Sequence, residues 1–170
     1  LAYFSGVAGD APEPVIVMRR YPDIYRLTSL VKDRSPVQAH LVSIAETLAS
    51  FHARAARGES IDAAATADAV AARWRDNIDE LHHQGILARE AIDDVWRLAA
   101  QFISGRSALF AKRIAERRIV DGHADLLTDD IFCTPDGPVL LDCLEFDDRL
   151  RYVDGIDDVA FLAMDLEYLG

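Results

Sequence analysis

The sequence has few lysines, few cysteines and no long apolar run. Only two of its 18 basic residues are lysines, Lys32 and Lys112, against 29 acidic residues, so the formal net charge is −11. This surplus of negative charge argues against a nucleic acid or an anionic membrane as the main partner. No apolar run approaches the roughly 20 residues that span a bilayer, so a membrane protein is not expected either.

The two cysteines, Cys133 and Cys143, are too few for a disulfide framework. We therefore expect reduced thiols and a cytoplasmic protein. The first residues have no basic stretch before an apolar one, which predicts no secretory leader. The sequence does not begin with methionine and it stops within a predicted helix, so we expect a piece of a longer protein.

The apolar residues, 51% of the total, recur at helical spacing through the first two thirds of the sequence. Steps of three and four residues place Val95, Phe102 and Leu109 on the inner face of one helix, and Ile156 and Val159 on that of another. Ser35 is a candidate N-cap before Pro36. The predicted elements are a hairpin within residues 1–20, a short helix over 27–31, and longer helices over 36–51, 61–83 and 89–117, with a last helix from about residue 154.

After residue 118 the apolar period changes from about 3.6 to about 2, which predicts strands. A short strand at 119–120 leads into a polar loop over 121–130. A second hairpin follows, with strands at 131–133 and 139–141 around the turn Pro135-Asp136-Gly137. Helices first and a small group of strands late predict the α+β class.

Carboxylates gather around this second hairpin. Asp125 and Asp130 stand at the two ends of the polar loop, and Asp142 closes the outer strand of the hairpin. A tight hairpin returns the chain to its origin, so we expect Asp142 to approach Asp130. Converging carboxylates repel one another unless a cation neutralises them, and oxygen ligands suit Mg²⁺ or Mn²⁺. The alternative interpretation is an ordinary solvated acidic surface.

The same residues carry a resemblance to a known family. The run from His123 through Asp125 to Asp130 resembles the catalytic loop H-x-D-x-x-x-x-N of kinases, and Asp142 follows the next hairpin as their metal-binding Asp does. Together with Leu141 to Phe146 and the helix start at 157–161, it looks like the aminoglycoside phosphotransferase-like small-molecule kinases, in a bacterial branch of unassigned substrate. The resemblance is dense from residue 119 onward and weaker upstream.

This resemblance implies a protein-kinase-like fold, mainly its helical C-terminal lobe over 21–170, with a remnant of the N-terminal lobe and the hinge over 1–20. It implies transfer of the γ-phosphoryl group of ATP, or of GTP, to a hydroxyl group of a small molecule. The implied roles are catalytic base for Asp125, a loop brace for His123, Mg²⁺ ligands for Asp130 and Asp142, nucleotide contacts at the hinge for Met18, Arg19 and Arg20, and loop support for Asp158.

The sequence departs from the family in two ways. Asp130 stands where the family has Asn, and there is neither a glycine-rich phosphate loop nor a lysine on a predicted strand. Two alternatives therefore stay open: a pseudokinase that serves as a binding or scaffold module, and a metal-dependent phosphohydrolase that uses the same carboxylates. The acceptor cannot be read from the sequence. His40 and His52 are expected to be structural, and the neighbouring His82 and His83 to be exposed.

Overall fold

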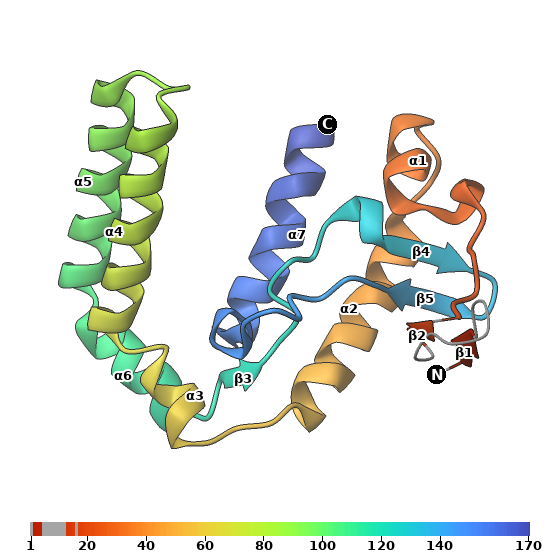
Figure 1. The fold of residues 1–170 in the computed structure, drawn as a ribbon, viewed down its shortest axis with the longest axis horizontal. Helices are drawn as coiled ribbons and strands as arrows, with labels where there is room; N and C mark the ends of the chain where they lie inside the picture. The colour runs from red at the N-terminus through yellow and green to blue at the C-terminus, as the bar shows by residue number, and fades with distance from the viewer. Residues whose placement is uncertain (1, 5–12, 16) are drawn as a thin grey trace.

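The structure is a computed structural model that describes residues 2–4, 13–15 and 17–170. Figure 1 shows a two-helix arm on one side, a body of strands and helices on the other, and a single helix between them. Seven α-helices are described: α1 (Leu27–Lys32), α2 (Gln38–Arg54), α3 (Glu59–Ala63), α4 (Ala67–Gln84), α5 (Arg89–Gly105), α6 (Ser107–Ala115) and α7 (Gly155–Leu169).

The described strands form three separate antiparallel pairs, β1 with β2, β3 with β6, and β4 with β5. These few short strands among long helices confirm the predicted α+β class. The bounds are β1 (Ala2–Phe4), β2 (Glu13–Val15), β3 (Ile119–Asp121), β4 (Ile131–Thr134), β5 (Gly137–Leu140) and β6 (Tyr152–Asp154).

The pairing of β1 with β2 agrees with the hairpin predicted at the N-terminus, and its turn lies outside the described residues. The second strand of the hairpin, β2, ends at Val15, and residues 17–22 are irregular. The side chain of Met18 is 78% exposed. The hinge segment is therefore open to solvent in this structure.

Two of the long predicted helices are each divided in two. The helix expected over 61–83 is α3 followed by α4, because Thr66 caps α4 with its side-chain oxygen, which accepts the N–H of Ala69 at 3.2 Å. The helix expected over 89–117 is broken at Arg106, directly after Gly105. Ser35 does not cap α2 either, since that helix begins at Gln38 with Val37 in the cap position.

The main core joins α1, α2 and α7 to the β4–β5 hairpin. Leu126 of the polar loop lies at its centre with 0% exposure, and Leu27, Ile44 and Ile131 are equally closed to solvent. Because Leu126 directly follows Asp125, burying its apolar side chain fixes the end of the loop that carries the predicted catalytic residue. The core thus positions the loop as well as stabilising the fold.

Several residues predicted to face inward do not. Val95 and Phe102 of α5 and Leu109 of α6 are 44 to 48% exposed, and Ile156 of α7 is 62% exposed. Helical period alone shows which residues share a face, but it cannot show how much of that face a neighbour covers. Here α4 packs along α5 and leaves part of the apolar face of α5 uncovered.

We expect Leu126→Ala to lower the free energy of unfolding by about 2–5 kcal/mol, because it leaves a cavity in the main core. Leu87→Ala is the matched control, since Leu87 is 56% exposed and should change stability by less than about 0.5 kcal/mol. Urea unfolding followed by circular dichroism measures both. Equal losses in the two variants would contradict this description of the core.

Candidate active site

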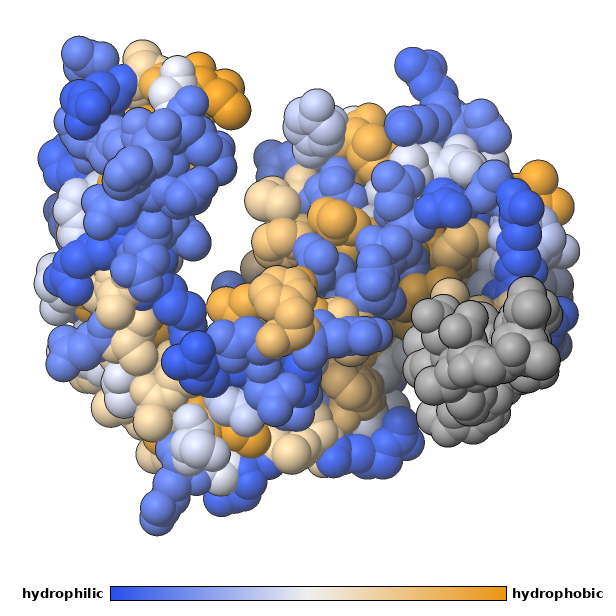
Figure 2. Space-filling model, in the orientation of Figure 1, coloured by the Kyte–Doolittle hydropathy of each residue, from blue (hydrophilic) through white to orange (hydrophobic). Residues whose placement is uncertain are grey.

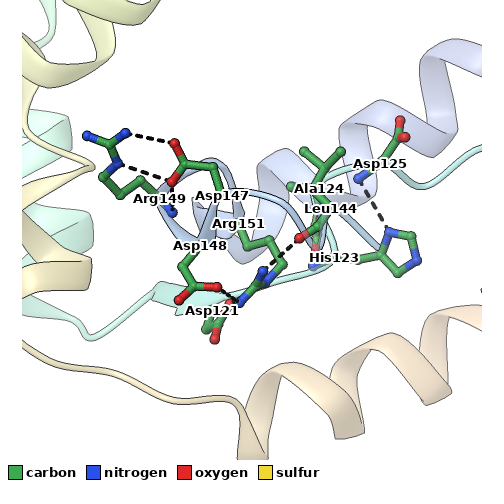
Figure 3. A network of polar contacts seen from close by, with 10 residues as sticks. Asp121, His123, Ala124, Asp125, Leu144, Asp147, Asp148, Arg149 and Arg151 are labelled. Carbon is green, nitrogen blue, oxygen red and sulfur yellow. Dashed lines mark hydrogen bonds and ion pairs between the residues drawn. The ribbon is translucent and has the colours of Figure 1, made fainter. Parts of the chain in front are cut away.

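The polar loop between β3 and β4 places the predicted catalytic residue at the edge of a hollow. The carboxylate of Asp125 points away from the side chain of His123 (Figure 3), and among the described residues none donates a hydrogen bond to it. Asp125 and Asp142 line the same cavity of about 560 Å³, together with residues 143–146. The structure therefore brings together two of the carboxylates that the sequence predicted to act jointly.

His123 holds the loop from inside. Its side chain is buried, its Nδ1 accepts the backbone N–H of Asp125 at 3.3 Å, and its Nε2 lies 2.9 Å from the carbonyl oxygen of Leu141. Because the amide of Asp125 can only donate, Nδ1 must be the acceptor, and Nε2 then carries the proton that is donated to Leu141. His123 thereby links the polar loop to the segment that carries Asp142, in agreement with its predicted bracing role.

Asp158, at the start of α7, binds two consecutive backbone amides of the loop. Its carboxylate accepts the N–H of His123 at 2.9 Å and the N–H of Ala124 at 2.5 Å, and it lies 2.8 Å from Nε2 of His52 on α2. Burial by itself would raise the pKa of Asp158, which is 1% exposed, but these hydrogen bonds outweigh it and hold the pKa below its usual value. The predicted support of the loop by Asp158 is confirmed.

Two residues of the site have positive φ angles without being glycine. Ala124 has φ 66° and Asp142 has φ 63°, a left-handed conformation that is costly for a residue with a Cβ. The bond from the amide of Ala124 to Asp158 supplies part of the compensation at the first position. Such backbone strain is often found where side chains must be aimed precisely. Asp142 lines the cavity, and Ala124 directly precedes Asp125, which lines it too.

Asp130 and Asp142 lie at the open end of the β4–β5 hairpin, where Asp130 precedes β4 and Asp142 follows β5. The backbone N–H of Leu141 donates to the carbonyl oxygen of Asp130 at 3.0 Å, which extends the ladder to the residue before Asp142. Burial raises the pKa of Asp130, and the negative charges of Asp142 and Asp125 raise it further. Three carboxylates thus share one region of negative potential, as the hairpin geometry predicted.

A divalent cation would relieve this repulsion, and its preferred ligands are carboxylate oxygens. The donor set of Asp130 and Asp142 therefore fits Mg²⁺. Across the described part of the chain, no group of three or more histidine, cysteine, aspartate or glutamate side chains is arranged closely enough to hold a metal ion. Mg²⁺ commonly completes its coordination with water and substrate phosphate rather than with protein groups alone.

Sequence reasoning missed the role of Arg151, which ties the segment after Asp142 to β3 (Figure 3). Its guanidinium binds the carboxylates of Asp121 at 2.9 Å and Asp148 at 2.7 Å, and it donates to the carbonyl oxygen of Leu144 at 2.7 Å. These bonds raise the pKa of Arg151 above its ordinary value. The signal in the sequence was weak, because the partners of Arg151 are up to 30 positions away.

A second missed element supports the far end of the loop. Asp165 of α7 accepts the backbone N–H of Thr128 at 2.8 Å and its hydroxyl at 2.6 Å. The hydroxyl of Thr28 on α1 lies 2.6 Å from that of Thr128, and it donates, since the single proton of Thr128 is used by Asp165. The helix α7 therefore holds the loop at two points, through Asp158 near its start and through Asp165 further along.

The predicted hinge residues are not joined to this site. Met18, Arg19 and Arg20 are exposed, and the guanidinium of Arg19 lies over the ring of Tyr21 at 5.7 Å. No hydrogen bond or ion pair links any of the three to the catalytic loop within the described ranges. Their assignment to a nucleotide site remains a prediction.

The other candidate residues have structural or surface positions. His52 binds Asp158, as a structural histidine would, whereas His82, expected to be exposed, is half-buried and lies 3.1 Å from Asp93. Cys133 is buried on β4, but Cys143 lies beyond the end of β5 and is exposed. The two cysteines therefore do not lie on facing strands of the hairpin, because β5 ends at Leu140, three residues before Cys143.

Comparison with known proteins finds relatives but no function. The chain is 52% identical over 172 aligned residues to the uncharacterized proteins Mb2027c of Mycobacterium bovis and Rv2004c of Mycobacterium tuberculosis. The alignment covers all of this chain and 34% of each relative, so the chain spans about a third of the length of the curated relatives it matches. No protein-family model and no solved structure matches the chain.

Within the described residues, no helix combines the length and apolar character needed to cross a membrane.

We expect Gly122→Ala to disturb the site, because an added Cβ would lie 2.7 Å from Oδ2 of Asp158 and 2.8 Å from Cγ2 of Val153. Such overpacking costs about 1–3 kcal/mol. Gly105→Ala is the control, since its Cβ would meet no atom within 4 Å, and it should be neutral or slightly stabilising. Thermal unfolding measures both, and a harmless Gly122→Ala would contradict the close packing of Asp158 against the loop.

We expect Asp158→Asn to lower the free energy of unfolding at neutral pH by about 2–4 kcal/mol, because the amide cannot satisfy two backbone donors and His52 as the carboxylate does. The pKa of Asp158 is lowered in the folded state, so its contribution is present above the usual carboxyl pKa and is lost as the pH falls through the folded value. The difference between wild type and variant should therefore shrink below about pH 4.

Urea unfolding at several pH values measures this dependence. Asp94→Asn is the control, because Asp94 is 70% exposed on α5 and should show a difference close to zero at every pH. A constant difference between wild type and Asp158→Asn from neutral to acid pH would contradict the role given to the ionised carboxylate.

Proposed function

We propose that the chain belongs to a phosphotransferase that moves the γ-phosphoryl group of ATP, or of GTP, to a hydroxyl group of a small molecule. The observation that carries the proposal is the position of Asp125. It stands on a loop held by His123 and Asp158, and its free carboxylate lines a cavity shared with Asp142. A rigid loop that presents one carboxylate as a base beside another as a metal ligand is what phosphoryl transfer requires.

In this proposal Asp125 orients the acceptor hydroxyl and accepts its proton as the bond to phosphorus forms. His123 and Asp158 keep that carboxylate in place through the backbone on either side of Ala124. Asp130 and Asp142 would hold Mg²⁺, and bound Mg²⁺–ATP would supply the phosphoryl group together with neutralising charge. Because the transition state is loose, positioning and charge neutralisation carry most of the catalysis.

The proposed architecture is that of a kinase-like fold in which residues 21–170 form most of the helical C-terminal lobe and residues 1–20 form the end of the N-terminal lobe with the hinge. The arrangement of β3, the polar loop, the β4–β5 hairpin and α7 supports it, since each stands in the order that the resemblance implies. We further propose a cytoplasmic location and a small-molecule partner, with no nucleic acid or membrane partner. The net charge of −11 agrees with the last point.

A pseudokinase is the second candidate, favoured by a specific observation. Asp130 replaces the Asn of the family, and neither Lys32 on α1 nor Lys112 on α6 lies on a strand where a phosphate-binding lysine belongs. Such a protein would bind a nucleotide or a partner without transferring phosphate. A phosphohydrolase would need a second base or a nucleophile, and the cavity offers Asp125 and Glu145 for that purpose.

The decisive experiment measures ATP consumption by the complete polypeptide against a panel of hydroxyl-bearing small molecules. We expect Asp125→Asn to lower turnover about 10²- to 10⁴-fold, because it removes the general base while it keeps the size of the side chain. Nucleotide affinity should change little. Turnover at the wild-type rate in Asp125→Asn would contradict the proposal, and nucleotide binding without any turnover in the wild type would favour the pseudokinase.

We expect the chain to bind Mn²⁺, used as a paramagnetic substitute for Mg²⁺, and Asp142→Asn to weaken that binding at least about tenfold. The control is Asp136→Asn in the exposed turn of the hairpin, which should bind Mn²⁺ as the wild type does. Asp130→Asn should bind less Mn²⁺ and yet raise the melting temperature by about 2 °C, since it removes a carboxylate whose folded-state pKa is raised by its neighbours. Water proton relaxation measures the binding, and unchanged affinity in Asp142→Asn would contradict the metal site.

A further inference from the structure

A large apolar groove lies between the arm and the start of α7. Its cavity of about 700 Å³ is lined by α4, α5 and α6 on one side and by the first residues of α7 on the other. Figure 2 shows a hollow between the arm and the rest of the molecule on this face. The groove shares no lining residue with the cavity at Asp125.

The side chains in this groove are apolar and uncovered by the described part of the chain. Trp74 of α4 is 39% exposed, Leu98 and Phe102 of α5 are 57% and 48% exposed, and Ile156 of α7 is 62% exposed. Scattered exposed apolar residues are ordinary, but a contiguous patch of large ones marks a surface that another molecule or segment covers. The side chains of α4 and α5 on one side and of α7 on the other leave a groove of the kind that binds an additional helix.

The charged residues at the base of the groove indicate which charge a covering segment should carry. Arg113 and Asp154 satisfy each other, with two bonds of 2.6 Å between guanidinium and carboxylate. Asp157 lines the groove as well, and no described residue forms an ion pair with it. Asp157 is an exposed residue, partial burial of its carboxylate raises its pKa, and the positive charge of Arg73 opposes that shift. A lysine or arginine at this end of a covering helix would provide the missing partner.

We propose that the groove is filled by an amphipathic helix from the same polypeptide, supplied from outside the 170 residues and carrying a basic residue opposite Asp157. The length of the relatives is the reason for proposing that the helix comes from the same polypeptide. The alignment with this chain takes up only 34% of their length, so two thirds of each relative is available to provide the helix. The proposal does not depend on the proposed phosphotransferase activity.

The test uses full-length Rv2004c, because the groove should be covered there. A photo-crosslinking amino acid, p-benzoylphenylalanine, replaces the residue aligned with Leu98, and mass spectrometry identifies what it captures. We expect crosslinks within the same polypeptide to an amphipathic segment outside the 172 aligned residues. The control is the position aligned with Arg97, whose side chain is 62% exposed and does not line the groove.

A second measurement uses this chain alone and needs no crosslink. The dye 1-anilinonaphthalene-8-sulfonate should bind the open groove, and Leu98→Asp should lower its fluorescence severalfold. Leu87→Asp, at a residue that is 56% exposed outside the groove, should leave the fluorescence unchanged, with circular dichroism reporting the folding of both variants. Capture of a second copy, of another protein or of nothing in the relative would overturn the proposal, as would equal dye binding by the two variants.

Discussion

The buried carboxylate of Asp158 is the interaction on which the site depends. It joins three parts of the chain that are far apart in sequence: the start of α7, the polar loop through the amides of His123 and Ala124, and α2 through His52. A charge that is removed from water is stable only when such partners surround it. The loop therefore cannot shift without leaving a buried charge unpaired, and this makes its backbone rigid enough to position Asp125.

A second feature of the site is the repulsion among its neighbouring carboxylates. Burial raises the pKa of Asp130, and the negative charges of Asp142 and Asp125 raise it further. Raised carboxyl pKa values in a cavity are common at functional sites. The positive φ angles of Ala124 and Asp142 point the same way, since both strained residues belong to the same small region.

The structure also separates two surfaces with different character. The cavity at Asp125 and Asp142 is acidic, whereas the groove beside the arm is mostly apolar and is lined by different residues. This division explains why helices with a clear apolar period, such as α5, still expose Leu98 and Phe102.

The sequence by itself determined the α+β class, the order of the main elements, the β4–β5 hairpin and the grouping of Asp125, Asp130 and Asp142, because these features follow from local period, turn residues and short-range chain return. Tertiary structure alone decided the rest. The pairing of β3 with β6 and the bonds of His52 to Asp158 and of Arg151 to Asp121 depend on partners tens of residues away. A periodic pattern records which residues share a face, but only the packed chain determines what meets that face.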